Sequence, residues 1–286
     1  MAVEFGLQLF SVRDEINKDF IGTLEKIASI GYKNLEIFFH GDDLSSTIGD
    51  LTPEELKSEL DRLALKAVSS HIAEEHLEAG KIDEVMKYAK VIGIQSLVVA
   101  IAYFKNKEEV VAFSKKLNEA GALLAKNGLQ LYYHNHYHEF QTFDGEYVLD
   151  IMLENTDKEL VKIEFDTYWA LRGGINPVTY LEKIGERCDL IHQKDLSANV
   201  DVINVFKKLE KDTVLNRDSM MKIRNIDDFT EAGQGIMDIP AIVETFKNNS
   251  NSKYLFIEQD WTKKNQLESI EISYEYISKL FHDQIK

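Results

Sequence analysis

The stretch VKIEFDTYWALRGGINPVTYLEKIGERCDLIHQK, residues 161–194, contains one complete strand–helix–strand unit. β-Rich runs at 161–166 and 189–194 enclose a segment at 176–184 whose apolar residues recur with helical spacing. A helical crossover of this kind joins two parallel strands. The unit therefore predicts a parallel sheet covered by helices.

The same alternation runs through the whole chain. The β-rich runs are FGLQLF (5–10), NLEIFF (34–39), KAVSSH (66–71), QSLVVA (95–100), LQLYYH (129–134), VKIEFD (161–166), DLIHQK (189–194) and YLFIEQ (254–259). The segments of helical period are 19–30, 53–64, 81–92, 107–126, 145–154, 176–184, 239–247 and 265–284. About eight such units predict an α/β fold closed into a (β/α)8 TIM barrel. A doubly wound open sheet is the rival fold, but no glycine-rich phosphate turn follows the first strand.

The chain length of 286 residues fits one barrel domain, 1–286, because α/β barrels commonly fill about 250 residues. No change of composition indicates a second domain. Residues 196–237 are too long for an ordinary loop after the seventh strand. They predict an active-site insertion with a short helix at 201–210. Thr52 and Pro53 mark the start of one helix, as a cap and a first-turn proline.

The formal net charge is −16, from 33 Lys plus Arg and 49 Asp plus Glu. Such a surface repels phosphate backbones and anionic membranes, which argues against nucleic acid and membrane partners. Cys188 is the single cysteine, so no intrachain disulfide forms, and we expect it to be a structural thiol. The N-terminus lacks a signal-peptide pattern and no window resembles a membrane span. We expect a cytoplasmic location.

Ligand-type side chains gather near the ends of the predicted strands. Residues two apart on a strand share a face. Four such pairs of polar residues lie near strand ends: His134 and His136, Glu164 and Asp166, His192 and Lys194, and Glu258 and Asp260. Glu36 and His71 lie at similar positions on the second and third predicted strands. The carboxyl ends of barrel strands carry the chemistry of this fold, and a divalent cation would partner buried histidines and carboxylates.

Several of these residues have a structural interpretation as well. Glu164 is either a ligand or an inward residue hydrogen-bonded within the barrel. Trp169 is either core or the apolar wall of a sugar site. His138 lies just past the strand and is expected to be exposed. Tyr132 and Tyr133 are expected to pack between the sheet and the helices.

The motifs LQLFSVRDE, GYKNLEIF, YHNHYHEF, FDTYW, IHQKD and FIEQDW together resemble the xylose isomerase-like TIM-barrel superfamily. This is the superfamily of sugar phosphate isomerases and epimerases, which includes D-tagatose 3-epimerase, inosose isomerase and inosose dehydratase. The resemblance covers nearly the whole chain. The motifs indicate the superfamily, but they do not indicate which substrate the protein binds.

The resemblance implies one divalent metal ion, most often Mn2+, with Zn2+, Co2+ or Mg2+ as alternatives. Its ligands would be Asp166, His192 and Glu258 on the sixth to eighth strands, with His134 at the fifth-strand position. The epimerases usually carry glutamate where His134 stands. Their scheme, in which two metal-bound glutamates act as acid and base, therefore cannot be carried over intact.

The same resemblance suggests which residues meet a sugar. Glu139 resembles a substrate-contacting glutamate and His71 a third-strand histidine of the family. With Glu36 and Trp169, they form the predicted substrate-binding set. The stretch EAGQGIMD, residues 231–238, resembles a glycine-containing loop that shapes the barrel mouth.

The predicted activity is isomerisation or epimerisation of a sugar or polyol through an enediolate beside a carbonyl. Glu258 is the predicted acid or base, and the catalytic residue on the other face is His136, Lys194 or Glu139. A metal-dependent lyase, a dehydratase or a 3-keto-glycoside-eliminating enzyme, would use the same site. An apurinic endonuclease is disfavoured by the charge of −16. A metal-free binding protein is a further alternative, and a homodimer or homotetramer is expected from the family.

Overall fold

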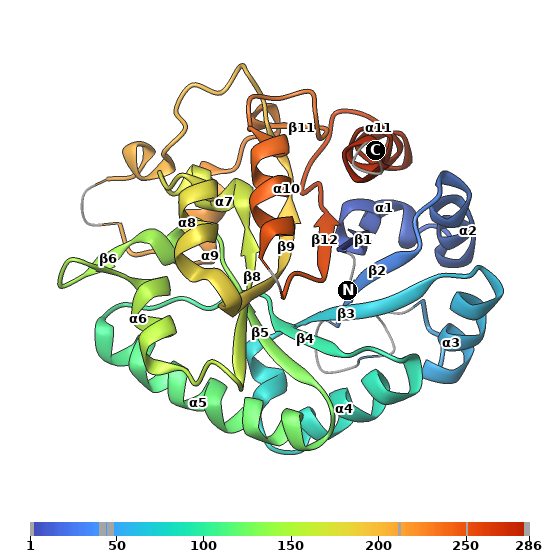
Figure 1. Ribbon diagram of the computed structural model, residues 1–286, viewed down its shortest axis with the longest axis horizontal. Coiled ribbons are helices and arrows are strands. Elements are labelled where there is room, and N and C mark those ends of the chain that lie inside the picture. The colour runs from blue at the N-terminus through green and yellow to red at the C-terminus, as the bar shows by residue number, and fades with distance from the viewer. Residues whose placement is uncertain (1–2, 40–43, 45–48, 211–212, 250, 283–286) are drawn as a thin grey trace.

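The computed structural model describes residues 3–39, 44, 49–210, 213–249 and 251–282. Within them, parallel strands close into a barrel in the order β1-β12-β9-β8-β5-β4-β3-β2 (Figure 1). These strands are β1 (Glu4–Gln8), β2 (Asn34–Phe38), β3 (Lys66–Ile72), β4 (Ser96–Val99), β5 (Gln130–His134), β8 (Val161–Asp166), β9 (Cys188–Gln193) and β12 (Tyr254–Ile257). The predicted (β/α)8 barrel is confirmed, and every predicted strand overlaps one barrel strand.

Helices surround the barrel on its outside (Figure 1). They are α2 (Phe20–Ile30), α3 (Pro53–Arg62), α4 (Lys81–Ile92), α5 (Lys107–Lys126), α6 (Val148–Asn155), α8 (Pro177–Ile184), α10 (Ile239–Asn248) and α11 (Gln266–His282). Each matches a predicted helix, and residues 283–284 of the last prediction lie outside the described residues. Thr52 caps α3 through Glu55 N, and Pro53 stands in its first turn, as expected. None of the described helices is long and apolar enough to cross a membrane.

The barrel interior has an apolar layer beneath the polar strand ends. Val98, Tyr132, Leu190 and Phe256 form this layer, and all are buried. The expectation that Tyr132 packs against the helices is therefore wrong. Tyr132 is two residues from His134, so both side chains share the inward face of β5. Tyr133 points outward and packs edge-on against Phe113 of α5, with ring centroids 6.0 Å apart.

Residues 196–237 form a long excursion between β9 and α10. Its elements are β10 (Asp195–Leu196), the 3-10 helix η6 (Val205–Lys208), α9 (Arg217–Ile223), the 3-10 helix η7 (Ile226–Asp228) and β11 (Phe229–Thr230). β10 pairs with β11 in antiparallel fashion. The helix predicted at 201–210 is only the four-residue η6. The excursion is anchored to α7 (Thr167–Arg172), where buried Arg172 Nη2 donates to Asp228 Oδ2 at 2.6 Å.

The loop at 231–238 folds around one buried carboxylate. Asp195 accepts the backbone N–H groups of Gly233 and Gly235, each at 2.9 Å, and of Met237 at 3.1 Å. A Cβ on Gly235 would lie 2.3 Å from Asp195 Oδ1. The glycine is thus required by the close approach of the loop backbone to this carboxylate.

Candidate metal centre and pocket

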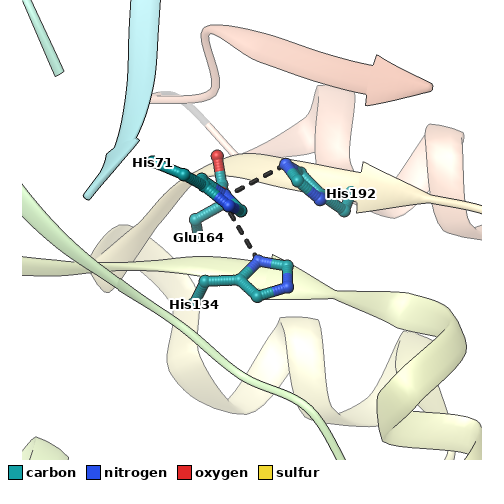
Figure 2. Close-up of side chains that lie close together, drawn as sticks. All are labelled: His71, His134, Glu164 and His192. Atoms are coloured by element: carbon teal, nitrogen blue, oxygen red, sulfur yellow. Dashed lines mark hydrogen bonds and ion pairs between the residues drawn. The ribbon is translucent and has the colours of Figure 1, made fainter. Parts of the chain in front are cut away.

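Buried histidines and carboxylates converge at the carboxyl ends of the barrel strands. Figure 2 shows the rings of His71, His134 and His192, from β3, β5 and β9, around Glu164 of β8. Glu164 Oε2 lies 2.7 Å from His71 Nε2 and 3.2 Å from both His134 Nδ1 and His192 Nε2. Glu164 is fully buried, and its Oε1 has no hydrogen-bond partner among the described residues.

A second buried carboxylate, Glu36 of β2, supports the same cluster from below. It accepts hydrogen bonds from Gln8 Nε2 at 2.7 Å and Ser69 Oγ at 2.6 Å. It also lies 2.5 Å from His192 Nε2 and 3.2 Å from His71 Nε2. Glu36 therefore holds the ring of His192 through Nε2, while the other ring nitrogen, Nδ1, faces Glu258.

The four predicted metal ligands meet above these two glutamates. His134, Asp166, His192 and Glu258 each offer one donor atom, and these atoms lie within 4.8 Å of one another. His134 Nε2 is 3.7 Å from Asp166 Oδ2, and His192 Nδ1 is 2.8 Å from Glu258 Oε2. A second combination, in which His71 and Glu164 join His134 and His192, also meets within 4.8 Å.

The ring nitrogens favour the first of these two combinations. His134 places Nδ1 on Glu164, and His192 places Nε2 on Glu36. The opposite nitrogen of each ring faces Asp166 or Glu258. Histidines that bind metals generally donate the far N–H to a carboxylate, which fixes the tautomer and the ring orientation. Both rings have this arrangement.

The charges of the histidines differ across the cluster. Burial opposes a charge on His71, but Glu36 and Glu164 outweigh it and raise the pKa of His71 to about 10. Burial, and then the positive charges of His192 and His71, hold the pKa of His134 well below its usual value. His134 is therefore a neutral imidazole, which is the form that binds a metal ion.

Lys194 brings a buried positive charge to the same place. Its ammonium contacts Asp166 Oδ2 and Glu258 Oε2 and lies 3.8 Å from Asp260 Oδ1. Burial alone would lower the pKa of Lys194, but Asp166 and Glu258 raise it above the usual range. The ammonium therefore stays charged. The two carboxylate oxygens that it contacts belong to Asp166 and Glu258, which are also predicted metal ligands.

A pocket of about 390 Å³ opens onto this cluster. On the side of the barrel strands, its polar lining residues are Gln8, His71, His134, His136, Glu258 and Asp260. Its other lining residues are Phe10, Phe38, Ala100, Ile101 and Tyr103, with Arg217, Met220, Met221 and Arg224 from α9 and its C-terminal end. The insertion therefore supplies one wall of the pocket, next to the strand ends.

The remaining predicted site residues divide into two groups. His136 lines the pocket, and its Nδ1 is buried without a partner among the residues described. Glu36, Glu139 and Trp169 are buried at 0%, 0% and 2% exposure and lie outside that lining. Glu139 accepts the Tyr133 hydroxyl at 2.5 Å and the backbone N–H of His136 at 2.8 Å. Trp169 packs on the His136 ring, with centroids 5.7 Å apart.

The expectation of an exposed His138 is wrong. The chain turns directly after β5 into the 3-10 helix η4 (His138–Phe140), which folds the side chain inward. His138 has no exposed surface, its Nε2 lies 2.9 Å from Ala102 O, and its ring stacks on Tyr103 with centroids 4.5 Å apart. Strand alternation cannot describe a residue beyond the end of the strand.

Several pocket residues were not found from the sequence. Gln8 is the last residue of β1, and Tyr103 lies in the loop after β4. Only the strand-end position of Gln8 could have indicated that it lines the pocket. Arg217 and Arg224 lie on the insertion, where no periodic pattern indicated which side chains face inward. Their place depends on how the insertion folds back over the barrel.

The fold and the cluster define a (β/α)8 barrel with a site at the carboxyl ends of its strands, the end used by enzymes of this architecture. A sequence model of the xylose isomerase-like TIM barrel family matches residues 24–280, and the chain belongs to this family.

Comparison with individual proteins identifies similar sequences and similar structures within and around this family. Inosose dehydratase of Clostridium beijerinckii is 31% identical over 159 residues, which are 55% of this chain and 49% of the relative. The chain spans about half the length of the curated relatives it matches. A sugar phosphate isomerase/epimerase structure from Parabacteroides distasonis is 25% identical, with a TM-score of 0.72 over 100% of this chain and 96% of its own. The IOLI protein, crystallised with a zinc atom, shares the fold at 17% identity and a TM-score of 0.72, covering 100% of both chains.

Proposed function

We propose that this chain is a divalent-metal-dependent enzyme that removes a proton from the carbon beside a carbonyl group of a sugar or polyol. The observation that carries the proposal is the convergence of His134, Asp166, His192 and Glu258 within 4.8 Å. The pocket of about 390 Å³ above them is large enough for a sugar-sized ligand.

The donor set suits a divalent transition metal. Two imidazole nitrogens and two carboxylate oxygens are ligands that Zn2+, Mn2+ and Co2+ accept. Both histidines are already oriented by buried glutamates, His134 by Glu164 and His192 by Glu36. The zinc atom of the IOLI structure agrees with this class of ion, while Mn2+ stays our prediction from the family. When bound, the ion would act as a Lewis acid that polarises the carbonyl and stabilises the charge formed by proton loss.

Glu258 is the proposed base. It lines the pocket, and the Lys194 ammonium and His192 fix its carboxylate on the other side. Lys194 places a positive charge beside the developing negative charge. His136 is a neutral hydrogen-bonding partner for the substrate, because burial, followed by the charges of His138 and Arg224, holds its pKa well below the usual value.

Elimination fits the site better than epimerisation. The carboxylates in the pocket lining, Glu258 and Asp260, both come from the end of β12. Epimerisation needs a proton donor on the second face of the substrate, where the usual fifth-strand glutamate is His134 here. In dehydration the carbon–hydrogen bond breaks to Glu258, and its electron pair forms the carbon–carbon double bond. The departing hydroxyl then takes the proton from Glu258 and leaves as water.

Isomerisation or epimerisation is the second candidate. His136 faces the pocket and is the residue available to exchange a proton away from Glu258. The names of the relatives support both reactions, since one is an inosose dehydratase and another a sugar phosphate isomerase/epimerase. Glu36 and Glu139 act in this proposal by positioning His192 and His136, and Trp169 does so by packing on His136.

The test is solvent deuterium exchange with a panel of inososes, ketoses and 3-keto-glycosides in the presence of Mn2+, Zn2+ or Co2+. We expect deuterium beside the carbonyl, with an enone or its tautomer as product if elimination follows. Glu258→Gln should abolish exchange, whereas the control Glu159→Gln, at an exposed site, should leave it unchanged. Exchange at the wild-type rate in Glu258→Gln would remove this residue from the mechanism. Failure to bind any of the three ions would leave a metal-free binding protein.

A further inference from the structure

The α9 wall of the pocket carries two arginines. Arg217 begins this helix and Arg224 directly follows it, and both line the pocket. Among the described residues that line the pocket, no other arginine or lysine occurs. The helix is held against the barrel by buried Met220, whose Sδ lies 3.3 Å from the Tyr103 hydroxyl.

The donors of Arg224 find no oxygen acceptor within the part of the chain that is described. Its Nη1 and Nη2 approach the sulfur atoms of Met221 and Met220 at 3.4 and 3.7 Å, and its Nε is buried without a partner. A thioether sulfur is a weak acceptor, so these N–H groups remain largely unsatisfied. Arg224 is half-buried, and leaving its buried Nε without an acceptor is costly, which suggests that an acceptor joins it in the working protein.

The position of Arg224 is nevertheless well defined. Its guanidinium lies 4.4 Å from the ring centroid of Trp261, within the range of a cation–π contact. Stacking on an aromatic ring leaves the edge of the guanidinium open, and this edge carries the N–H fork that matches a carboxylate or phosphate.

Internal carboxylates do not account for these two arginines. Asp260 lines the same pocket, but it lies 3.8 Å from Lys194 and within 4.0 Å of neither arginine. Arg217 makes no ion pair with any residue that the structure describes. Neither arginine lies within 4.0 Å of a carboxylate oxygen of Glu258 or Asp260, the two acidic residues in the described lining of the pocket.

We propose that Arg217 and Arg224 form an oxyanion subsite that binds a carboxylate or phosphate group of the substrate. The inference rests on the proposed function, since it places the anionic group on the sugar or polyol that reacts at Glu258. The substrate class thereby narrows to acidic sugar or polyol derivatives.

The experiment uses three ketoses that differ only at C6: D-fructose, D-fructuronate and D-fructose 6-phosphate. Their binding to the metal-loaded protein is measured by isothermal titration calorimetry. We expect at least one anionic ketose to bind about tenfold or more tightly than fructose, as expected for a charge-assisted hydrogen bond. Whichever of D-fructuronate and D-fructose 6-phosphate binds more tightly shows whether the subsite prefers a carboxylate or a phosphate.

The double variant Arg217→Gln/Arg224→Gln should bind all three ketoses with equal affinity. Arg62→Gln is the matched control, because Arg62 is an exposed arginine that pairs with Glu25 and Glu59 on the outside of the barrel. Thermal unfolding of each variant verifies that it is folded. Equal affinity for the three ketoses in the wild type, an anion preference that persists in the double variant, or no anionic ketose binding below about 10 mM would each overturn the subsite.

This result is separable from the proposed function. Deuterium exchange on neutral substrates without any anion preference would overturn the subsite and keep the enzyme. An anion preference that depends on the arginines, with no deuterium exchange on any substrate of the panel, would keep the subsite and overturn the enzyme.

Discussion

Glu36→Gln should weaken metal binding although Glu36 is not one of the proposed ligands. The carboxylate is fully buried and lies 2.5 Å from His192 Nε2. Burial alone would raise its pKa, but His71 and His192 hold the pKa of Glu36 well below its usual value, so it is ionised. It holds the Nε2–H of His192, so that a metal ion which displaces the proton on Nδ1 would meet this nitrogen already in position.

The size of the effect follows from the contacts that glutamine keeps. The amide oxygen can accept the same N–H of His192, and Ser69 can turn its hydroxyl to suit the amide nitrogen. What is lost is the negative charge, which separates a charge-assisted hydrogen bond of about 1.5–3 kcal/mol from a neutral one of about 0.5–1.5 kcal/mol. We expect a loss of about 10- to 100-fold in metal affinity, or about 1.4–2.7 kcal/mol.

The measurement is competition between the protein and a chromogenic chelator for Zn2+ or Co2+ at fixed pH. Ser69→Ala is the matched control, because it removes a hydrogen bond of 2.6 Å to the same carboxylate and keeps the charge. We expect Ser69→Ala to change the affinity by less than about threefold. A Glu36→Gln protein with unchanged affinity would refute the role of Glu36, and an equal loss in both variants would assign the effect to packing instead of charge.

Three further changes have defined outcomes. Added Zn2+ or Mn2+ should raise the melting temperature of Lys194→Met more than that of the wild type, because the ammonium no longer competes with the metal ion for the two carboxylates it contacts. An equal rise in variant and wild type would contradict this competition. Gly235→Ala should lower the free energy of unfolding by about 1–3 kcal/mol in urea, since its Cβ would lie 2.3 Å from Asp195 Oδ1; unchanged stability would show that the loop can move away. Arg172→Met should cost about 3 kcal/mol, because it leaves buried Asp228 with only the more distant Lys208, 3.7 Å away, as an ion-pair partner. Most of this loss should return in Arg172→Met/Asp228→Asn; no recovery would mean that packing of the arginine stem dominates.

The barrel itself was predictable because its signals are local. Period-two and helical patterns depend on neighbours in the chain, and α4 and α5 occupy the predicted residues 81–92 and 107–126. Short helices such as α7 were missed because six residues are too few to show a helical period. Tyr132 was misplaced although alternation from His134 already put it inside the barrel.

The strand ends were predictable for a different reason. Once the sheet is parallel and closed, its carboxyl ends must meet, so ligand-type residues there must also lie close together. This reasoning gathered ten strand-end residues, and the resemblance to the xylose isomerase-like superfamily selected His134, Asp166, His192 and Glu258 among them as ligands. The structure places the donor atoms of these four residues within 4.8 Å of one another. Strand geometry could not separate ligands from their supports, because the direction of each ring nitrogen depends on glutamates from other strands.

The side chains that the insertion contributes to the pocket could not be predicted from the sequence. Residues 196–237 have no strand or helix period that fixes which side chains face the barrel, so nothing in the sequence singled out Arg217 or Arg224. Their position is set by distant contacts, among them Arg172 with Asp228 and Met220 with Tyr103. Under the two proposals, the barrel strands would determine which bond the protein acts on, and the fold of the insertion would determine what is attached to the molecule that carries that bond.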